Sequence, residues 1–297
     1  MTASTTPTTA LTMMIGVRVR RCHVRGGRSG PGASQYCGVC CAGYMIQVCL
    51  IGAAGQPRGG KYLMTASWTT VVASSPSREK NRPEASPREP AATGAPVYAE
   101  GPHRASRPRF ESEKHNPESG ADRDFRPDVE VKHGDVIEGA GFALEAVATP
   151  GHTANHLAFA WTERSINFVG DHVMGWSTSI VAPPDGSMID YMASLERLEQ
   201  RPEQLYFSGH GPEIPEGPRY VRFLARHRRA REASILHRLG KGEADIPTMV
   251  RAIYIGLDPR LANAAGYSVL AHLEDLVARG VVATDGDPVI GGTYRMV

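Results

Sequence analysis

Cysteine is absent from most of this chain. The five cysteines all lie within the first 49 residues, at Cys22, Cys37, Cys40, Cys41 and Cys49. The rest of the chain therefore cannot depend on disulfides. Cys37 and Cys40 have zinc-knuckle spacing, but no second Cys or His pair follows at a suitable distance, so we expect free thiols there.

Long apolar runs and a strong net charge are also absent. The most apolar stretch, residues 42–55, is too short to span a bilayer. No charged start leads into an apolar segment with a small-residue cleavage site, so we expect no signal peptide, no membrane partner and a cytoplasmic location. The net charge of +2 is too small to require nucleic acid as a partner.

Residues 1–92 differ in composition from the rest. They begin rich in Thr and Ser, continue rich in Arg, Gly, Pro and Ser, and end in a stretch crowded with Pro, Ser, Arg and Glu. Few of their apolar residues recur at the period of a strand or a helix, so little of this segment should bury a core. We predict a low-complexity segment with no recognisable domain before residue 93.

The remaining sequence predicts two domains, residues 93–217 and 218–297. Strand patterns in the first domain lie at residues 95–99, 129–131, 142–149, 164–169 and 205–207, with a helix at 188–200. The second domain shows three helices at 220–239, 246–255 and 267–279, then Gly280 as a C-cap and a hairpin of 281–283 with 293–295. The first domain is therefore mixed α/β (α+β), and the second is a winged helix.

Three loops that follow predicted strands carry the residues of a hydrolytic metal centre. The segments TPGHT, FVGD and SGH each follow an apolar strand and a Gly break, and they place His152, Asp171 and His210 at one edge of a sheet. Such ligands converge from different loops and leave a position for water, whose pKa the metal lowers. The pattern therefore predicts metal-assisted hydrolysis.

These segments resemble those of the metallo-β-lactamase superfamily. The likeness continues through RRARE at 228–232 and SVLAHL at 268–273, which are similar to the winged helix of the lactamase-beta-2-like branch. The resemblance implies an αββα sandwich, incomplete in its N-terminal half, and two zinc ions. It assigns His152 to the first ion, Asp171 to a bridging position and His210 to the second ion, with His152 and Asp171 as catalytic residues.

The resemblance also suggests roles for two further residues. His156 takes a position behind the ligands or on the substrate side, and Asp185, in the PPDG turn at 183–186, lies near the substrate mouth. We expect His103, His115 and His133 on surface loops. His172 should point away from its neighbour Asp171.

The first ligand segment of that superfamily, His-x-His-x-Asp-His, has no counterpart in this sequence. It should lie upstream of residues 95–98, yet His23 is the only histidine before residue 93. The first metal ion then lacks two of its ligands. For the second metal ion, His210 is the one remaining ligand that does not also bind the first. Because catalytic zinc usually has three protein ligands, we expect tight zinc binding to be lost.

Two functions follow from these observations. The first is a metal-dependent hydrolase in which zinc-bound hydroxide attacks an ester, thioester, amide or phosphodiester of a small molecule or RNA. The alternative is a catalytically impaired relative that acts as a binding or nucleic-acid-interacting module. The arginines between 219 and 231 suit phosphates, but a solvated helix face is the simpler interpretation. We favour the winged helix as a lid or homodimer element.

We predict that the coding DNA holds part of the missing segment in another frame. Residues 68–72, WTTVV, are encoded TGG ACN ACN GTN GTN, and reading from the third base fixes Asp and permits His-Ser-Gly after it. The GCN codon of Ala73 completes a further codon that permits a second Gly. That ending is typical of the missing motif, although the same frame cannot supply its two upstream histidines. Residues 1 to about 90 are then wholly or partly a frame-shifted translation. Sequencing the DNA for residues 63–90 tests this, and absence of the motif from all three frames would refute it.

Overall fold

The computed structural model describes residues 15–18, 47–50, 63–64, 96–113, 123–139, 142–242 and 244–297. Strand β1 (Ile15–Arg18) pairs antiparallel with β2 (Gln47–Leu50). The cysteine side chains and the boundary at residue 92 lie outside the described part of the chain. The interpretation of residues 1–92 therefore stays a prediction. The division between residues 217 and 218 also stays a prediction.

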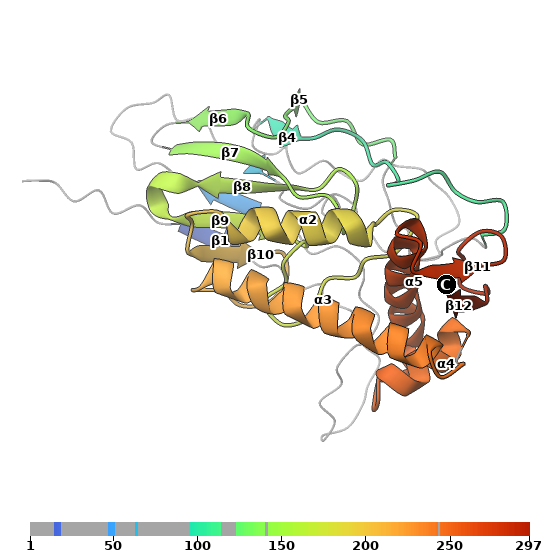
Figure 1. The fold of residues 1–297 in the computed structure, drawn as a ribbon. Coiled ribbons are helices and arrows are strands. Elements are labelled where there is room, and N and C mark those ends of the chain that lie inside the picture. The colour runs from blue at the N-terminus through green and yellow to red at the C-terminus, as the bar shows by residue number, and fades with distance from the viewer. Residues whose placement is uncertain are drawn as a thin grey trace, which may run out of the picture.

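A five-stranded sheet forms the centre of the first domain, in the order β10-β9-β8-β7-β6 (Figure 1). Its strands are β6 (Val136–Gly139), β7 (Phe142–Ala148), β8 (Leu157–Trp161), β9 (Ile166–Gly170) and β10 (Leu205–Ser208). Strands β9 and β10 are parallel, while β8 is antiparallel to both β7 and β9. Strands β7, β9 and β10 therefore all end at the same edge of the sheet.

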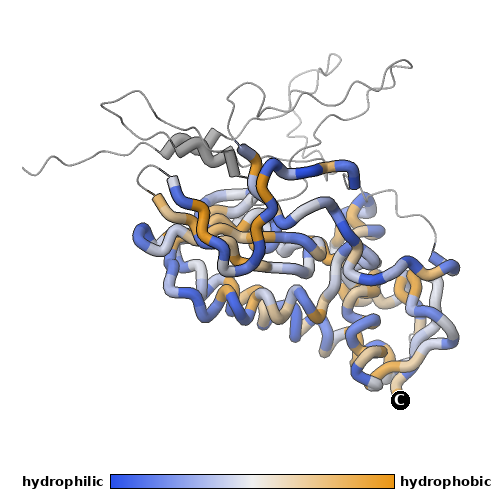
Figure 2. Tube along the Cα trace, turned by 90° about the horizontal axis from the view of Figure 1, so that it is seen from above, coloured by the Kyte–Doolittle hydropathy of each residue, from blue (hydrophilic) through white to orange (hydrophobic). Residues whose placement is uncertain are grey.

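Helices α2 (Met188–Glu199) and α3 (Gly217–Leu239) cover one face of this sheet. Val147, Val169 and Ala158 of the sheet share a core with leucines of both helices, among them Leu195 and Leu224. Each fully buried leucine contributes about 1.5–3 kcal/mol to folding. Figure 2 shows the alternation of hydrophobic and hydrophilic residues along these helices, which is what lets one side of each face the sheet.

The opposite face of the sheet has a second core, rich in aromatic residues. Phe159, Trp161 and Phe168 are almost fully buried there, and Tyr98 packs against them. Tyr98 belongs to a small parallel sheet in which β4 (Val97–Ala99) lies between β3 (Leu63–Met64) and β5 (Val129–Glu130). The central sheet is therefore packed on both faces.

The C-terminal region has the predicted winged-helix composition. It contains α4 (Ile246–Ile253), a 3₁₀ turn (Pro259–Leu261), α5 (Ala262–Ala278), β11 (Val282–Thr284) and β12 (Tyr294–Met296). The two strands form the predicted antiparallel hairpin. Gly280 has φ 69°, so it is the left-handed C-cap that the sequence indicates. These elements gather at one end of the sheet (Figure 1).

Helix α3 belongs to both cores. Val221 and Leu224 pack in the core under the sheet, whereas Ile235 and Leu239 pack with α4 and α5. The helix begins at Gly217, three residues before the predicted start, because Pro218 occupies a first-turn position where no backbone N–H donor is needed.

Other boundaries differ from the predictions for local reasons. Strand β8 was not predicted, because all five of its residues are buried and give no polar alternation. Strand β9 begins at Ile166 instead of 164, because residues 162–164 form a 3₁₀ turn that ends in left-handed Ser165. Within the described ranges no helix is long and apolar enough to cross a bilayer.

His272 of α5 generates a testable pH dependence of stability. Its side chain is 1% exposed, and burial, followed by the charges of Arg228 and Arg231, lowers its pKa from 6.5 to about 3. Below pH 6.5 the unfolded chain binds a proton that the folded chain does not. The free energy of unfolding should therefore fall by about 1.4 kcal/mol per pH unit between about pH 6 and pH 4 from this group.

Urea unfolding at about pH 4, 5 and 6, in buffer without sulfate or phosphate, measures this slope. In the His272→Gln variant, the free energy of unfolding should fall less steeply with decreasing pH, by about 1.4 kcal/mol per pH unit. An identical slope in the two proteins would mean that His272 does not contribute.

Candidate functional site

Asp171 and His210 meet at the edge where β9 and β10 end. The parallel register pairs Ser208 with Gly170, so the residues that follow them lie side by side. The His210 Nε2 atom is 3.4 Å from the Asp171 Oδ1 atom. The Gly209 N–H group donates a 2.7 Å hydrogen bond to the Gly170 carbonyl, which holds the two loops together.

Gly209 is required by this close approach. A Cβ atom at this position would lie 2.0 Å from the Asp171 Oδ1 atom, well inside van der Waals contact. The Asp171 carboxylate therefore lies directly against the backbone that carries His210. The SGH sequence places glycine where the site has no room for a side chain.

His152 follows β7 at the same edge. Gly151 has φ 134°, and a Cβ atom there would meet the Tyr191 backbone at 2.3 Å. The His152 Nδ1 atom lies 2.6 Å from the Ile180 carbonyl oxygen. Because a carbonyl only accepts, Nδ1 carries a proton and Nε2 is the nitrogen that faces away from this contact, which is the arrangement of a histidine oriented for a metal ion.

The three predicted ligands do not form one complete group. Asp171 and His210 converge, but among the residues that the structure describes no three His, Cys, Asp or Glu side chains are arranged to hold a metal ion. A catalytic zinc ion usually needs three protein ligands. The described residues therefore do not fit a complete zinc centre, although their donor types suit one.

Two neutral histidines lie behind these ligands. His156 is 2% exposed, with Nδ1 2.7 Å from the Thr149 hydroxyl, and burial lowers its pKa to about 3, with a further contribution from His152. His172 is fully buried against Tyr191, at 4.5 Å between ring centroids, and burial holds its pKa well below 6.5. His156 thus lies in the interior, behind the candidate ligands.

Asp185 is held by a loop that the sequence placed on the surface. His103 was expected to be exposed, but its side chain is 3% exposed and its Nε2 atom lies 3.1 Å from Asp185 Oδ1. The loop folds back because the Ser106 hydroxyl donates to the Asp185 carbonyl and Asn155 donates to the Gly101 carbonyl. No local pattern could reveal a contact between residues 82 positions apart.

The other two histidines of that group have different outcomes. His133 is exposed, as predicted. His115 lies outside the described residues.

The arginines of α3 do not form one basic surface. Arg219, Arg222, Arg226 and Arg229 are exposed, but Arg228 is 3% exposed and donates a hydrogen bond to the Ser179 carbonyl. The Ser179 hydroxyl in turn lies 2.6 Å from the Asp171 carbonyl oxygen. Sequence reasoning missed both residues. The signal for Arg228 was its helical spacing from the apolar Val221, Leu224 and Ala225.

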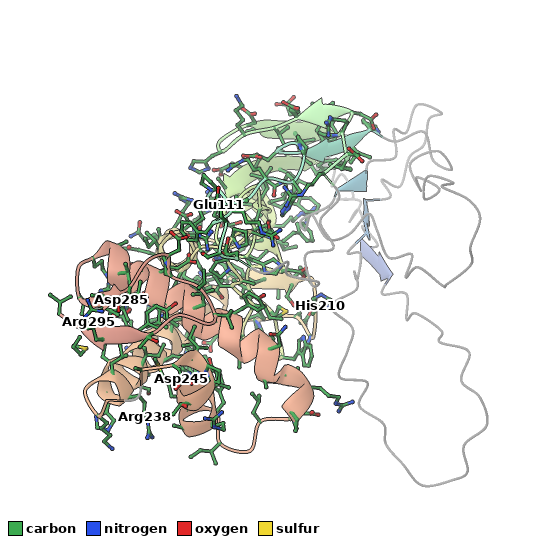
Figure 3. The ribbon with its side chains drawn as sticks, turned by 90° about the vertical axis from the view of Figure 1, so that its right-hand side faces the viewer. Glu111, His210, Arg238, Asp245, Asp285 and Arg295 are labelled. Carbon is green, nitrogen blue, oxygen red and sulfur yellow. The ribbon has the colours of Figure 1, made fainter. Side chains whose placement is uncertain are left out.

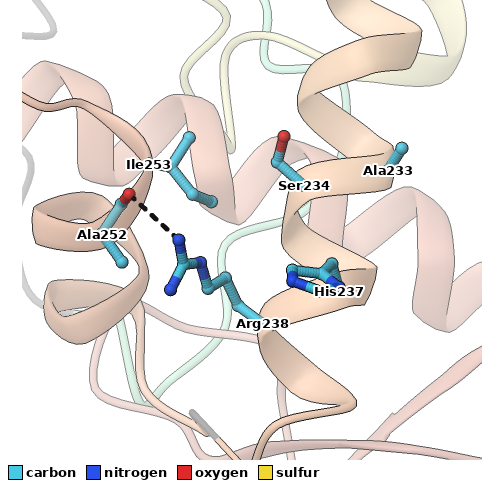
Figure 4. A pocket seen from close by; sticks show the side chains of 6 residues that line it. All are labelled: Ala233, Ser234, His237, Arg238, Ala252 and Ile253. Atoms are coloured by element: carbon cyan, nitrogen blue, oxygen red, sulfur yellow. Dashed lines mark hydrogen bonds between the residues drawn. The ribbon is translucent and has the colours of Figure 1, made fainter.

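A pocket of about 340 Å³ lies in the winged-helix region, between α3 and α4 (Figure 4). Its lining residues are Ala233, Ser234, His237, Arg238, Ala252 and Ile253. None of them is a predicted site residue. The candidate ligands are also distant from the wing: in Figure 3, His210 lies away from Asp285 and Arg295.

Comparison with known protein families agrees with this arrangement. Residues 86–210 match the family model described as Metallo-beta-lactamase superfamily, and residues 246–292 match Beta-lactamase associated winged helix domain. This chain carries a metallo-beta-lactamase domain followed by a winged helix domain. The predicted family and fold class are therefore confirmed.

Several curated proteins are similar over part of their length. The Beta-lactamase-like protein 2 homolog of Drosophila melanogaster is 30% identical over 153 residues, covering 50% of this chain and 51% of that protein. Its Caenorhabditis elegans counterpart is 31% identical over 144 residues, 48% of this chain and 47% of that protein. The Atrochrysone carboxyl ACP thioesterase of Claviceps purpurea (strain 20.1) is 30% identical over 128 residues, 43% and 38%. The chain spans about half the length of the first two relatives.

Two solved structures share the fold. A metallo-beta-lactamase family protein from Thermus thermophilus superposes with a TM-score of 0.50 at 22% identity, over 64% of this chain and 60% of its own. A beta-lactamase domain protein from Burkholderia ambifaria also gives 0.50, at 20% identity, over 61% and 56%. At this identity the likeness establishes the architecture alone.

The close packing at Gly209 generates a prediction. The Gly209→Ala substitution should displace the Asp171 carboxylate and destabilise the protein by about 1–3 kcal/mol, as overpacking does elsewhere. Gly291→Ala is the matched control, because nothing lies within 4 Å of a Cβ atom there. Thermal unfolding of both variants measures the difference, and equal melting temperatures would contradict the packing at Gly209.

Proposed function

We propose that this chain is a catalytically impaired member of the metallo-beta-lactamase hydrolases that retains the C-terminal share of the metal site. The observation that carries the proposal is the Asp171–His210 pair, 3.4 Å apart, without a third converging ligand among the described residues. His152 lies on the same sheet edge, with Nδ1 donating to the Ile180 carbonyl. The fold and the donor types support a hydrolytic ancestry.

A complete site would hold zinc ions that activate water for the hydrolysis of an ester, thioester, amide or phosphodiester. Of these we place thioesters and esters first, because one relative is named a thioesterase. In this chain the Ile180 carbonyl orients the His152 ring, and Gly209 keeps Asp171 against the His210 loop. These contacts do not depend on a bound ion, so the half-site survives without one.

Nucleic-acid binding is the second candidate. Arg226 and Arg229 are exposed on α3 and have no ion pair within the described residues. Arg228 is buried and does not contribute to such a surface. We place this candidate second because Arg219 and Arg222 on the same helix are already paired with glutamates. The cytoplasmic location and the homodimer stay predictions.

Metal content tests the main proposal. The chain purified from zinc-supplemented medium and dialysed should retain well below one zinc ion per chain by mass spectrometry, because a pair of ligands holds zinc weakly. Its hydrolysis of a thioester and ester panel should not exceed that of Asp171→Ala. About two zinc ions per chain, lost together with activity in Asp171→Ala, would instead establish a working binuclear hydrolase.

A further inference from the structure

A group of basic side chains lies where α3 and α5 approach each other, and nothing in the proposed function uses it. Two of its members are buried and two are half-buried. Its members are His227, Arg228 and Arg231 of α3 and His272 of α5, here called the α3–α5 basic cluster. Arg228 is 3% exposed and His272 is 1% exposed. His227 and Arg231 are close neighbours, with 3.5 Å between His227 Nε2 and Arg231 Nη2.

Five buried nitrogen atoms in this cluster have no hydrogen-bond partner among the described residues. They are His227 Nδ1, Arg228 Nε, Arg231 Nε and both ring nitrogens of His272. Buried polar groups in folded proteins are almost always satisfied, and an unmade bond at such a group is costly. The Nε–H groups of Arg228 and Arg231, the Nδ1–H group of His227 and the single N–H group of the neutral His272 ring are donors without an acceptor. These unsatisfied donors indicate a missing acceptor.

The contacts that the two arginines do make are with neutral groups. Arg228 donates to the Ser179 carbonyl and lies over the Tyr191 ring at 5.0 Å. Arg231 donates to the Ile253 carbonyl at 3.2 Å and lies over the Tyr254 ring at 4.2 Å. Neither arginine therefore receives a compensating negative charge from these partners.

No carboxylate of the described chain neutralises these arginines. The acids on the neighbouring turns, Glu232 and Asp275, both pair with Arg279, at 2.8 and 3.1 Å. Neither Arg228 nor Arg231 forms an ion pair with any described residue. A buried charge without a counter-charge is strongly unfavourable, so the cluster needs an anion from outside the protein.

The chemistry of the cluster selects the kind of anion. A guanidinium group matches the oxygen atoms of phosphate and sulfate, and an oxyanion accepts from several donors at once. Ordered water accepts hydrogen bonds but supplies no negative charge. The phosphate backbone of a polymer cannot reach side chains such as Arg228 and His272, which are 3% and 1% exposed. A small free oxyanion satisfies all of these conditions.

We propose that the α3–α5 basic cluster binds one small free oxyanion of the sulfate or phosphate class. The anion accepts from the Nε–H groups of Arg228 and Arg231, from the Nδ1–H group of His227 and from the one N–H group of the neutral His272 ring. Through Arg228 and Ser179 it links the winged helix to the loop after β9. This site is separate from the candidate metal ligands and does not rest on the proposed hydrolytic ancestry.

Titration of the full chain with sodium sulfate at constant ionic strength tests the proposal. Calorimetry and thermal unfolding should show saturable binding and a saturable rise in melting temperature, and inorganic phosphate should compete. The Arg228→Met variant should raise the sulfate dissociation constant about tenfold or more, since one charge-assisted contact is lost. Arg229→Met is the matched control, because this neighbouring arginine is exposed and should leave the dissociation constant unchanged.

If Arg228→Met does not fold, the half-buried Arg231 provides the second variant, and Arg231→Gln should weaken sulfate binding in the same direction. Sulfate also stabilises proteins in general, by a rise that does not saturate. A non-saturating rise of equal size in the parent, Arg229→Met and either cluster variant would overturn the proposal. So would calorimetry that detects no heat of sulfate binding to the parent chain.

Discussion

The parallel pairing of β9 with β10 is the constraint on which the candidate site depends. These two strands come from segments that are far apart in the sequence, yet their register brings Ser208 beside Gly170. The loops that follow therefore begin side by side. The hydrogen bond from the Gly209 N–H group to the Gly170 carbonyl holds them together. The position of the acidic and imidazole side chains is therefore set by main-chain geometry before any ligand is present.

This origin accounts for how the proposed half-site would persist without a bound metal ion. The contacts that orient the candidate ligands are a carbonyl at Ile180, a glycine at 209 and a serine at 179. All three also stabilise the loops in which they lie. The positions of these ligands therefore depend on the folded loops and do not depend on an upstream ligand segment. A chain can therefore keep the family fold and the loop geometry without having a complete catalytic site.

Much of the fold and of the candidate site could be predicted from local patterns. Strands such as β7 and β10 alternate or end at glycine, and the winged helix shows helical spacing with a glycine cap. Strand β8 was missed because a strand buried on both faces has no period to detect. The His103–Asp185 contact and the role of Arg228 were missed because each joins distant segments, and only the tertiary structure brings them together.

Helix α3 has a consequence for how the two domains move. Its 23 residues extend over about 35 Å without interruption, and its two halves are packed in different cores. Opening the winged helix like a hinged cover would require a flexible joint, but the joint here is a continuous helix. The metallo-beta-lactamase domain and the winged helix are therefore mechanically coupled. Any displacement of one must bend α3 or unpack it from the other, so the pair should respond to force and to denaturant as one body.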